Sequence, residues 1–580
     1  MVPANESLQF WIECQVLIRI TMKRKTISYT LGLLLSLSLY SCNEDYLIKY
    51  PLDSPSSETF ISNEQELNMA VTGAYNALYQ APKATPMPFP LTIDYASDIG
   101  WERNTNALQI LGLGNADANN EFTSDFWNLL YVGIQRCNTI LEKVENLNAV
   151  VPEAVLKQRI SEVKFLRAYY YFFLNELFGG VPLLTKNVPL AESAIPRASK
   201  DEINNFILAE LDACVANLPE VATGSDLGRA TKGAALALKS RAALFNKKYQ
   251  EAADAAKAVM ALNQYQLHNN FEQLFKYAGE SSKEIIWAIQ YKKGLATHSI
   301  SSQFYSRLMQ GFSNKIPVQS LIDSYECTDG LNIDKSPLFD PKKPFLNRDP
   351  RLTQTVVLPQ TLSLGVIFET HPDSTMTWDY REATPKRIAN TDATNAYATF
   401  SGYLWRKYAD PIDFTDRSNS ELNAILFRYA EVLLNYVEAK VELNQIDNSV
   451  YEAINQVRQR PSVAMPAITT GKTQSQMRSI VRKERKYELA AEGLRLFDIR
   501  RWNIAHQVMP GDLLGRIRTG WLANAPSIDE NGTPNYAQVS NRAEMRVIEK
   551  RNFNAERDYV WPIPRIETEV NPNLTQNKNY

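Results

Sequence analysis

The sequence has few cysteines and histidines for its length, and their spacing excludes several kinds of site. Its 580 residues include 5 cysteines and 4 histidines, and the histidines lie far apart in the chain. No two cysteines form a CxxC pair, and those beyond residue 42 are odd in number: Cys137, Cys214 and Cys327. A disulfide framework needs an even set, and a zinc site needs clustered ligands. The sequence therefore predicts neither a metal site nor a bound cofactor.

An excess of charge of one sign and the common catalytic motifs are also missing. The formal net charge is −2, so no global field attracts nucleic acid. No GxSxG or HExxH sequence occurs, and Gly112 and Gly114 are not followed by the third glycine of GxGxxG. We therefore expect a protein that is not an enzyme and does not bind nucleic acid.

Long hydrophobic runs are absent, and the nearest approach to one lies close to the N-terminus. Residues 30–40 form an apolar stretch after the positive run at 23–25. A bilayer span needs roughly 20 apolar residues, so this shorter stretch is typical of a signal peptide. It ends in Leu-Tyr-Ser-Cys at 39–42, which resembles a bacterial lipobox, although Tyr40 is bulky for its position. We predict cleavage before Cys42 and acylation of that cysteine; the alternative is an ordinary secretory signal.

This signal divides the first part of the chain. Signal peptides begin near the start of a protein, so we expect Met22 to be the initiating residue and residues 1–21 to be a mis-assigned extension. Residues 22–41 are then the lipoprotein signal peptide, and residues 42–62 form a polar, lipidated tether. We expect a protein held to a membrane outside the cytoplasm, because acylation at one cysteine can supply more than one buried chain.

Apolar residues spaced three and four apart predict amphipathic helices through most of the remaining chain. The helices at 232–246 and 249–262 are rich in alanine, so they can approach closely, as paired helices of tetratricopeptide repeats do. Short strands are predicted at 284–291 and 354–358, where helical periodicity weakens. The predicted helices lie at 63–79, 126–144, 163–177, 200–218, 232–246, 249–262, 424–442, 449–459 and 474–503.

These elements predict a mainly α fold. We expect a degenerate tetratricopeptide-like helical-repeat superdomain with an N-terminal half at 63–262 and a C-terminal half at 263–580. The C-terminal half contains a long insertion of irregular structure and short strands at about 290–420. The tail from Pro510 is rich in proline, asparagine and glycine, which predicts irregular but packed structure.

Several sequence blocks follow one another in order along the chain. They are CNTIL at 137–141, KFLRAYYYFFLNELFGGVPLL at 164–184, GRATKGAALALKSRAALF at 228–245, NRDPRL at 347–352, RYAEVLLNYVEAK at 428–440, IVRKERKYELAAEGLRLFDIRRW at 480–502 and WPIP at 561–564. Together they resemble the SusD/RagB family of nutrient-binding outer-membrane lipoproteins of Bacteroidetes. The acidic run at 43–45 is similar to the surface-export signal of such lipoproteins, which implies the outer face of the outer membrane.

The resemblance implies a binding function. Family members resemble lids on a SusC-like TonB-dependent outer-membrane transporter and hold an oligosaccharide or polysaccharide before import. In RagB-like relatives the ligand is a peptide, which is the alternative for this chain. A glycosidase and a pure scaffold that binds only the transporter are further alternatives.

Aromatic side chains in loops are the candidate sugar-binding residues, because a sugar ring has an apolar face and polar edges. Family members similar to this chain use a loop tryptophan near position 101, so Trp101 is the first candidate, with Asp98, Arg103 and Asn104 beside it. Polar neighbours predict that the Trp101 ring is at least partly exposed; the alternative is a tryptophan that caps the helical core. Further candidates in the insertion are Tyr291, Tyr305, Trp378 and Tyr380. The tryptophans in the family blocks, expected in the core, are Trp127, Trp287, Trp405, Trp502 and Trp561.

Two charged stripes could be mistaken for a catalytic site. Glycosidases use a pair of carboxylates, so closely spaced glutamates are one possible signal. Opposed charged stripes on neighbouring repeat helices are also typical of ion-pair networks that fix packing register, and we favour this interpretation. The stripes are Glu484, Glu488, Glu492 and Arg495 on one segment and Arg428, Glu431, Asn435 and Glu438 on the other.

Overall fold

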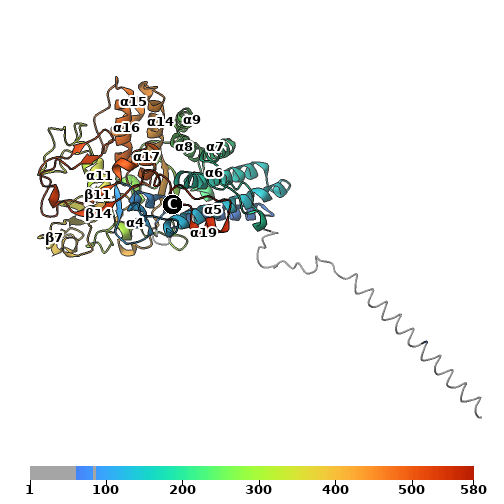
Figure 1. Cartoon of the computed structure of the whole chain (residues 1–580), viewed down its shortest axis with the longest axis horizontal. Helices are drawn as coiled ribbons and strands as arrows, with labels where there is room; N and C mark the ends of the chain where they lie inside the picture. The colour runs from blue at the N-terminus through green and yellow to red at the C-terminus, as the bar shows by residue number, and fades with distance from the viewer. Residues whose placement is uncertain (1–21, 23–59, 83–86) are drawn as a thin grey trace, which may run out of the picture. The chain divides into compact units, whose positions relative to one another are not determined.

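A computed structural model describes Met22, residues 60–82 and residues 87–580 (Figure 1). The predicted lipidation site, Cys42, lies outside these residues, as do the signal peptide beyond Met22 and the tether up to residue 59. In the part of the chain that is described, no helix is both long enough and apolar enough to cross a bilayer.

Long amphipathic helices follow one another through the N-terminal half. Helix α6 contacts both α5 and α7, and α8 contacts both α7 and α9, so neighbours in sequence are neighbours in space (Figure 1). Their positions confirm the helices predicted from apolar spacing. The bounds are α2 Glu64–Tyr75, α5 Glu121–Lys143, α6 Glu153–Phe178, α7 Lys200–Val215, α8 Lys232–Phe245 and α9 Tyr249–Ala261.

Small side chains allow α8 and α9 to pack closely. Ala234 and Ala256 are fully buried, and the Ser240 hydroxyl in α8 donates to the Ala252 carbonyl in α9 at 3.1 Å. Helix α8 begins at a capping threonine, because the Thr231 side chain accepts a hydrogen bond from the Ala234 amide. The predicted helix pair is therefore confirmed.

The C-terminal half continues the helical array. Helix α14 (Tyr429–Glu442) contacts α8 and α9, and it also contacts α15 (Asn448–Arg458) and α16 (Gln474–Leu489). Residues 63–580 form one compact unit as a result. The prediction of a mainly α, tetratricopeptide-like fold is confirmed.

The helix predicted from residue 424 begins later than expected. Residues Ala424–Arg428 form strand β10, which pairs antiparallel with β2 (Ile285–Ile289), the strand predicted at 284–291. Every residue of β10 is buried, and the Phe427 ring stacks on the Trp287 ring at a centroid distance of 6.0 Å. A short apolar run in a sequence is compatible with either a strand or a helix. Here residues 424–428 form a strand because they pair with a strand that is distant in the chain.

The helix predicted at 474–503 is interrupted. Helix α16 ends at Leu489, and α17 spans Arg495–Arg501. Gly493 has φ +77°, and a Cβ there would lie 1.9 Å from the Pro90 carbonyl oxygen, so only glycine fits. The backbone N–H groups of Gly493 and Arg495 both donate to Asp94 at 3.0 Å. This contact from the N-terminal half replaces the helical hydrogen bonds that the break removes.

Short sheets occupy the region predicted as an insertion. Four strands form one antiparallel sheet in sequence order, and the remaining strands of the described residues are paired two by two. The four strands are β5 Thr361–Ser363, β6 Val366–Phe368, β7 Met376–Asp379 and β8 Lys386–Ala389. The pairs used below are β1 Gly100–Glu102 with β3 Lys315–Pro317, β4 Val356–Val357 with β9 Leu404–Trp405, and β11 Gly511–Leu514 with β14 Val547–Arg551. Strand β7 lies far from α6–α9 in Figure 1.

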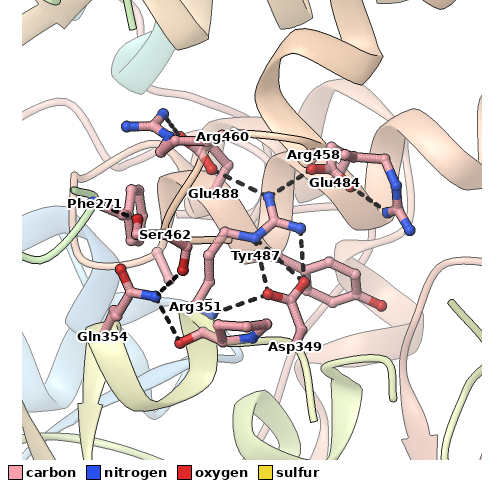
Figure 2. Close-up of polar contacts among 12 residues, drawn as sticks. Phe271, Asp349, Arg351, Gln354, Arg458, Arg460, Ser462, Glu484, Tyr487 and Glu488 are labelled. Carbon is pink, nitrogen blue, oxygen red and sulfur yellow. Dashed lines mark hydrogen bonds and ion pairs between the residues drawn. The ribbon is translucent and has the colours of Figure 1, made fainter. Parts of the chain in front are cut away.

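A buried network of arginines and glutamates connects the C-terminal elements (Figure 2). Arg351 is fully buried and bonds Asp349 at 2.7 Å, Glu484 and Glu488. Arg428, at the end of β10, contacts Glu488 at 2.8 Å. Both charged stripes therefore lie within the protein, and the interpretation as an ion-pair network is confirmed.

Candidate functional site

The four-stranded sheet presents aromatic side chains to solvent. In β7, Thr377 and Asp379 are buried, whereas Met376 and Trp378 are exposed, as is Tyr380 directly after the strand. Successive side chains of a strand point to opposite faces, so the last three share the outer face. Trp378 is 41% exposed and Tyr380 is 46% exposed, which leaves both rings accessible to a ligand.

These two rings and one arginine form a continuous platform. The ring centroids of Trp378 and Tyr380 are 6.3 Å apart and their planes are inclined by 39°. Arg387 lies opposite Trp378 on β8, and its guanidinium carbon is 5.4 Å from the Trp378 ring centroid. Arg387 also donates to the Met376 carbonyl at 3.0 Å, which helps to hold the guanidinium over the Trp378 ring. The platform therefore combines an apolar surface with hydrogen-bond donors.

Tyr305 supports this sheet from its inner face and does not contact solvent. Its ring is 1% exposed and packs with Met309, Val366 and Ala409. The Tyr305 hydroxyl donates to the Asp410 carbonyl. Tyr305 was a candidate ligand residue from sequence, but its burial removes it from any ligand surface.

Trp101, the first candidate from sequence, is a core residue. Its side chain is 4% exposed, so the prediction of a partly exposed ring is wrong. The indole N–H donates to Glu549 at 2.7 Å, and the ring stacks on Phe400 with centroids 5.5 Å apart. Strand β1 places Trp101 opposite Ile316, inside an apolar cluster. Its polar sequence neighbours are misleading because these partners are far away in the chain.

Asp98 and Tyr291 are also buried. Asp98 forms an ion pair with Arg495 at 2.8 Å. Burial raises the pKa of Asp98, but the Arg495 guanidinium outweighs this effect and holds the pKa below its usual range. The Tyr291 ring lies edge-on to His298, with centroids 4.6 Å apart. Both side chains have structural partners and are closed to a ligand.

Arg103 and Asn104 are the members of that loop that reach the surface. Asn104 is exposed, and Arg103 is partly exposed. Arg103 donates to the backbone carbonyls of Phe312 and Tyr397, and its guanidinium carbon lies 5.5 Å from the Tyr397 ring centroid. Tyr397 is strongly exposed. Tyr397 was not among the ligand residues predicted from sequence; the signal for it is an aromatic residue within a polar loop.

Four of the five tryptophans expected in the core are found there. Trp127, Trp287, Trp405 and Trp561 are buried, and Trp502 is half-buried. Among the predicted ligand residues, the structure therefore leaves Trp378, Tyr380, Arg103 and Asn104 accessible.

Two family models match the chain. The model described as the SusD family matches residues 283–580, which is more than half of the chain, and the model described as "Starch-binding associating with outer membrane" matches residues 45–244. The chain belongs to the SusD family. The resemblance given by the ordered sequence blocks is confirmed.

Relatives of known structure share the fold over nearly their whole length. A SusD-like carbohydrate binding protein from Bacteroides fragilis is 30% identical, with a TM-score of 0.76, and the match covers 89% of this chain and 99% of that one. The surface glycan-binding protein A from Bacteroides thetaiotaomicron, solved in complex with laminarihexaose, is 18% identical with a TM-score of 0.66, over 89% of this chain and 100% of that one. The SusD-like protein P25 of Formosa agariphila is 26% identical over 81% of this chain and 89% of its own.

Proposed function

We propose that this SusD-family protein binds an oligosaccharide at the outer face of the outer membrane and passes it to a SusC-like TonB-dependent transporter. The observation that carries this proposal is the exposed platform of Trp378, Tyr380 and Arg387 on the four-stranded sheet. Structural relatives described as a carbohydrate binding protein and as a complex with laminarihexaose support a glycan ligand.

The platform suits a sugar for physical reasons. The apolar face of a sugar ring can stack on an indole or phenol ring, while the Tyr380 hydroxyl and the Arg387 guanidinium remain available for sugar hydroxyls. Trp378 lies on a strand whose alternate residues are buried, and Tyr380 follows that strand directly, so the backbone that carries both rings is held in place before ligand binds. Preorganised rings lose little entropy on binding, which favours affinity.

Replacing Trp378 with alanine is expected to weaken glycan binding by about five- to a hundredfold. Stacking on one aromatic ring contributes roughly 1–3 kcal/mol, by analogy with nucleobases, and 1.4 kcal/mol corresponds to tenfold in affinity. Retardation in native gels that contain laminarin or starch would identify a ligand polysaccharide. Calorimetric titration with its oligosaccharide would then give the affinity of each variant.

Leu190→Ala is the matched control for this measurement. Leu190 is a strongly exposed apolar residue of the N-terminal half, in the short helix η5 (Leu190–Glu192). It should keep wild-type affinity, and both variants should melt near wild type because exposed substitutions usually change stability by about 0.5 kcal/mol or less. Unchanged affinity of Trp378→Ala at unchanged stability would contradict the platform as the glycan site.

We also propose binding without catalysis. Glu484 and Glu488, the carboxylate pair of the charged stripe, are fully buried and held by arginines, so neither can reach a sugar. Incubation with the bound polysaccharide should release no reducing ends. Hydrolysis that survives purification of the protein would overturn this part of the proposal.

Anchoring through Cys42 gives a separate prediction. Cys42→Ala is expected to remove acylation, so the protein should move from the detergent phase to the aqueous phase in Triton X-114 partitioning. Cys137→Ala is the control, since Cys137 is a free, buried thiol within α5. A Cys42→Ala protein that stays in the detergent phase would contradict a lipid anchor at this residue.

A further inference from the structure

A pocket rich in arginine lies at one end of the four-stranded sheet. Its volume is about 160 Å³. Its lining includes Thr370, which follows β6, and Asp392, which follows β8. It also includes Phe400 and the side chains of Arg516, Arg518 and Arg546.

The strand pair β11–β14 brings these arginines together. Leu514 pairs with Val547 at the end of the ladder, and the Gly515 amide donates to the Arg546 carbonyl at 2.8 Å. Arg516 and Arg546 therefore leave the same end of one strand pair, although 30 residues separate them in sequence. No local sequence pattern would have revealed this cluster.

Hydrogen bonds and ring contacts from neighbouring residues fix the Arg516 side chain in place. It is 5% exposed, and it donates to the Thr370 hydroxyl at 3.1 Å and to the Ile517 carbonyl at 3.0 Å. Its guanidinium carbon lies 4.3 Å from the Trp521 ring centroid. Gly402 has φ +85°, and a Cβ there would lie 2.4 Å from Arg516 Cγ, so the glycine leaves space for the arginine.

None of the three arginines has a carboxylate partner within ion-pair distance among the described residues. Arg546 lies over the Phe400 ring at 4.0 Å, and Arg518 contacts the Ala393 carbonyl at 3.5 Å. The buried Arg351, by contrast, forms an ion pair with Asp349 at 2.7 Å. Burial lowers the pKa of Arg516 and of Arg546, and the charge of Arg518 adds to both effects. An anion in the pocket would relieve this repulsion.

The nearby carboxylates are engaged by backbone groups. Glu369 accepts hydrogen bonds from the Thr370 and His371 amides, both at 2.7 Å. Asp392 accepts from the Leu308 amide at 3.1 Å, and burial raises its pKa to about 6. The pocket lining contains three arginines and one carboxyl residue, Asp392, while Glu369 lies near Arg516 outside the lining, so positive charge is in excess.

We infer that this pocket binds the anionic substituent, a sulfate ester or a carboxylate, of an acidic polysaccharide. The inference rests on the proposed glycan function, because the pocket lies at one end of the sheet that carries the aromatic platform. Ala389 pairs with Met376, and Asp392 follows only three residues later. Trp378 is two residues further along β7, roughly 7 Å from Met376. One oligosaccharide can therefore stack on Trp378 while its charged group lies among the arginines, whose planar donors match carboxylate and sulfate oxygens.

The test compares acidic with neutral polysaccharides in native affinity gels. Carrageenan and fucoidan supply sulfate, alginate and polygalacturonate supply carboxylate, and laminarin and starch are neutral. We expect one acidic class to retard the wild-type protein more than the neutral gels do, with an effect that weakens between 50 mM and 500 mM NaCl. The class of acidic polysaccharide that retards the protein shows whether the pocket prefers sulfate or carboxylate.

The double variant Arg518→Gln/Arg546→Gln avoids the buried Arg516 and should lose about tenfold or more in affinity for the acidic ligand. Arg565→Gln is the matched control, since Arg565 forms an exposed ion pair with Glu569 in α19 (Arg565–Val570). It should bind like wild type, and melting checks that each variant is folded. If the double variant binds the acidic polysaccharide as tightly as wild type does, or if only the neutral gels retard the protein, the pocket is not an anion site. Either result leaves the proposed sugar-binding platform unaffected. Retention by none of the six gels would overturn both.

Discussion

Replacing Glu488 with glutamine is expected to lower the free energy of unfolding by about 3–5 kcal/mol, because it removes one partner of a buried ion network. Glu488 is fully buried, and its oxygens accept from Arg460 at 2.7 Å and from Arg351 at 3.1 Å (Figure 2). They also accept from Arg428 at 2.8 Å. Glutamine keeps the shape but turns an amide donor toward these arginines. Urea unfolding followed by circular dichroism measures the loss.

Glu153→Gln is the control for this change. Glu153 pairs with Lys157 on the surface of α6, where both side chains are largely exposed, so its loss should change stability by less than about 1 kcal/mol. A Glu488→Gln protein as stable as this control would contradict a structural role for the network. Loss of glycan binding at unchanged stability would instead move Glu488 to the ligand site.

The pH dependence of unfolding should change with the same substitution. Burial raises the pKa of Glu488, but Arg460, Arg428 and Arg351 together outweigh it and hold the pKa well below its usual range. A carboxylate whose folded pKa is depressed contributes stability above its unfolded pKa, about 4.3, and loses it as the pH falls toward the folded value. Wild type should therefore lose stability more steeply than Glu488→Gln below about pH 4.

Helices were predictable because their signal is local. The apolar stripe of α6 and the alanines of α8 and α9 repeat every three or four residues. Helix α9 buries the face that its alanines define, whereas α6 is buried on every side from Phe165 to Phe178. The errors at 424–428 and 490–494 have the opposite origin. Strand β10 exists because β2 lies beside it, and the break before α17 exists because Asp94 accepts its amides.

The candidate site was predictable only where one strand determines exposure. Trp378 and Tyr380 alternate with Thr377 and Asp379, so their shared outward face follows from the period of β7. Tyr305 gave no comparable signal, because it faces the core beneath the sheet. The arginine pocket depends on β11 pairing with β14 across an intervening segment, which no local pattern records.

Trp101 is buried although its sequence neighbours are polar, so the polarity of neighbouring residues did not predict its exposure. Its substitution is expected to cause a second large loss of stability. Trp101→Ala should lower the free energy of unfolding by about 3–5 kcal/mol, since truncating a buried aromatic loses transfer energy and leaves a cavity. The ring packs in one cluster with Ile316, Val357, Phe368 and Leu404. Urea unfolding measures this loss directly.

Loss of the indole hydrogen bond adds to the loss of stability. Comparing Trp101→Ala with Trp378→Ala separates a role in the core from a role in ligand binding. Trp101→Ala leaves Glu549 without its indole donor, although Arg551 and Gln109 still contact that carboxylate at 2.7 Å and 2.8 Å. Trp101→Phe keeps a ring in the cluster, so it should lose less stability than the alanine variant. Trp378→Ala, at an exposed position, should show the reverse pattern, with wild-type stability and weakened glycan binding. If Trp101→Ala unfolds at the same urea concentration as Trp378→Ala, the burial of Trp101 contributes no net stability and its assignment to the core is wrong.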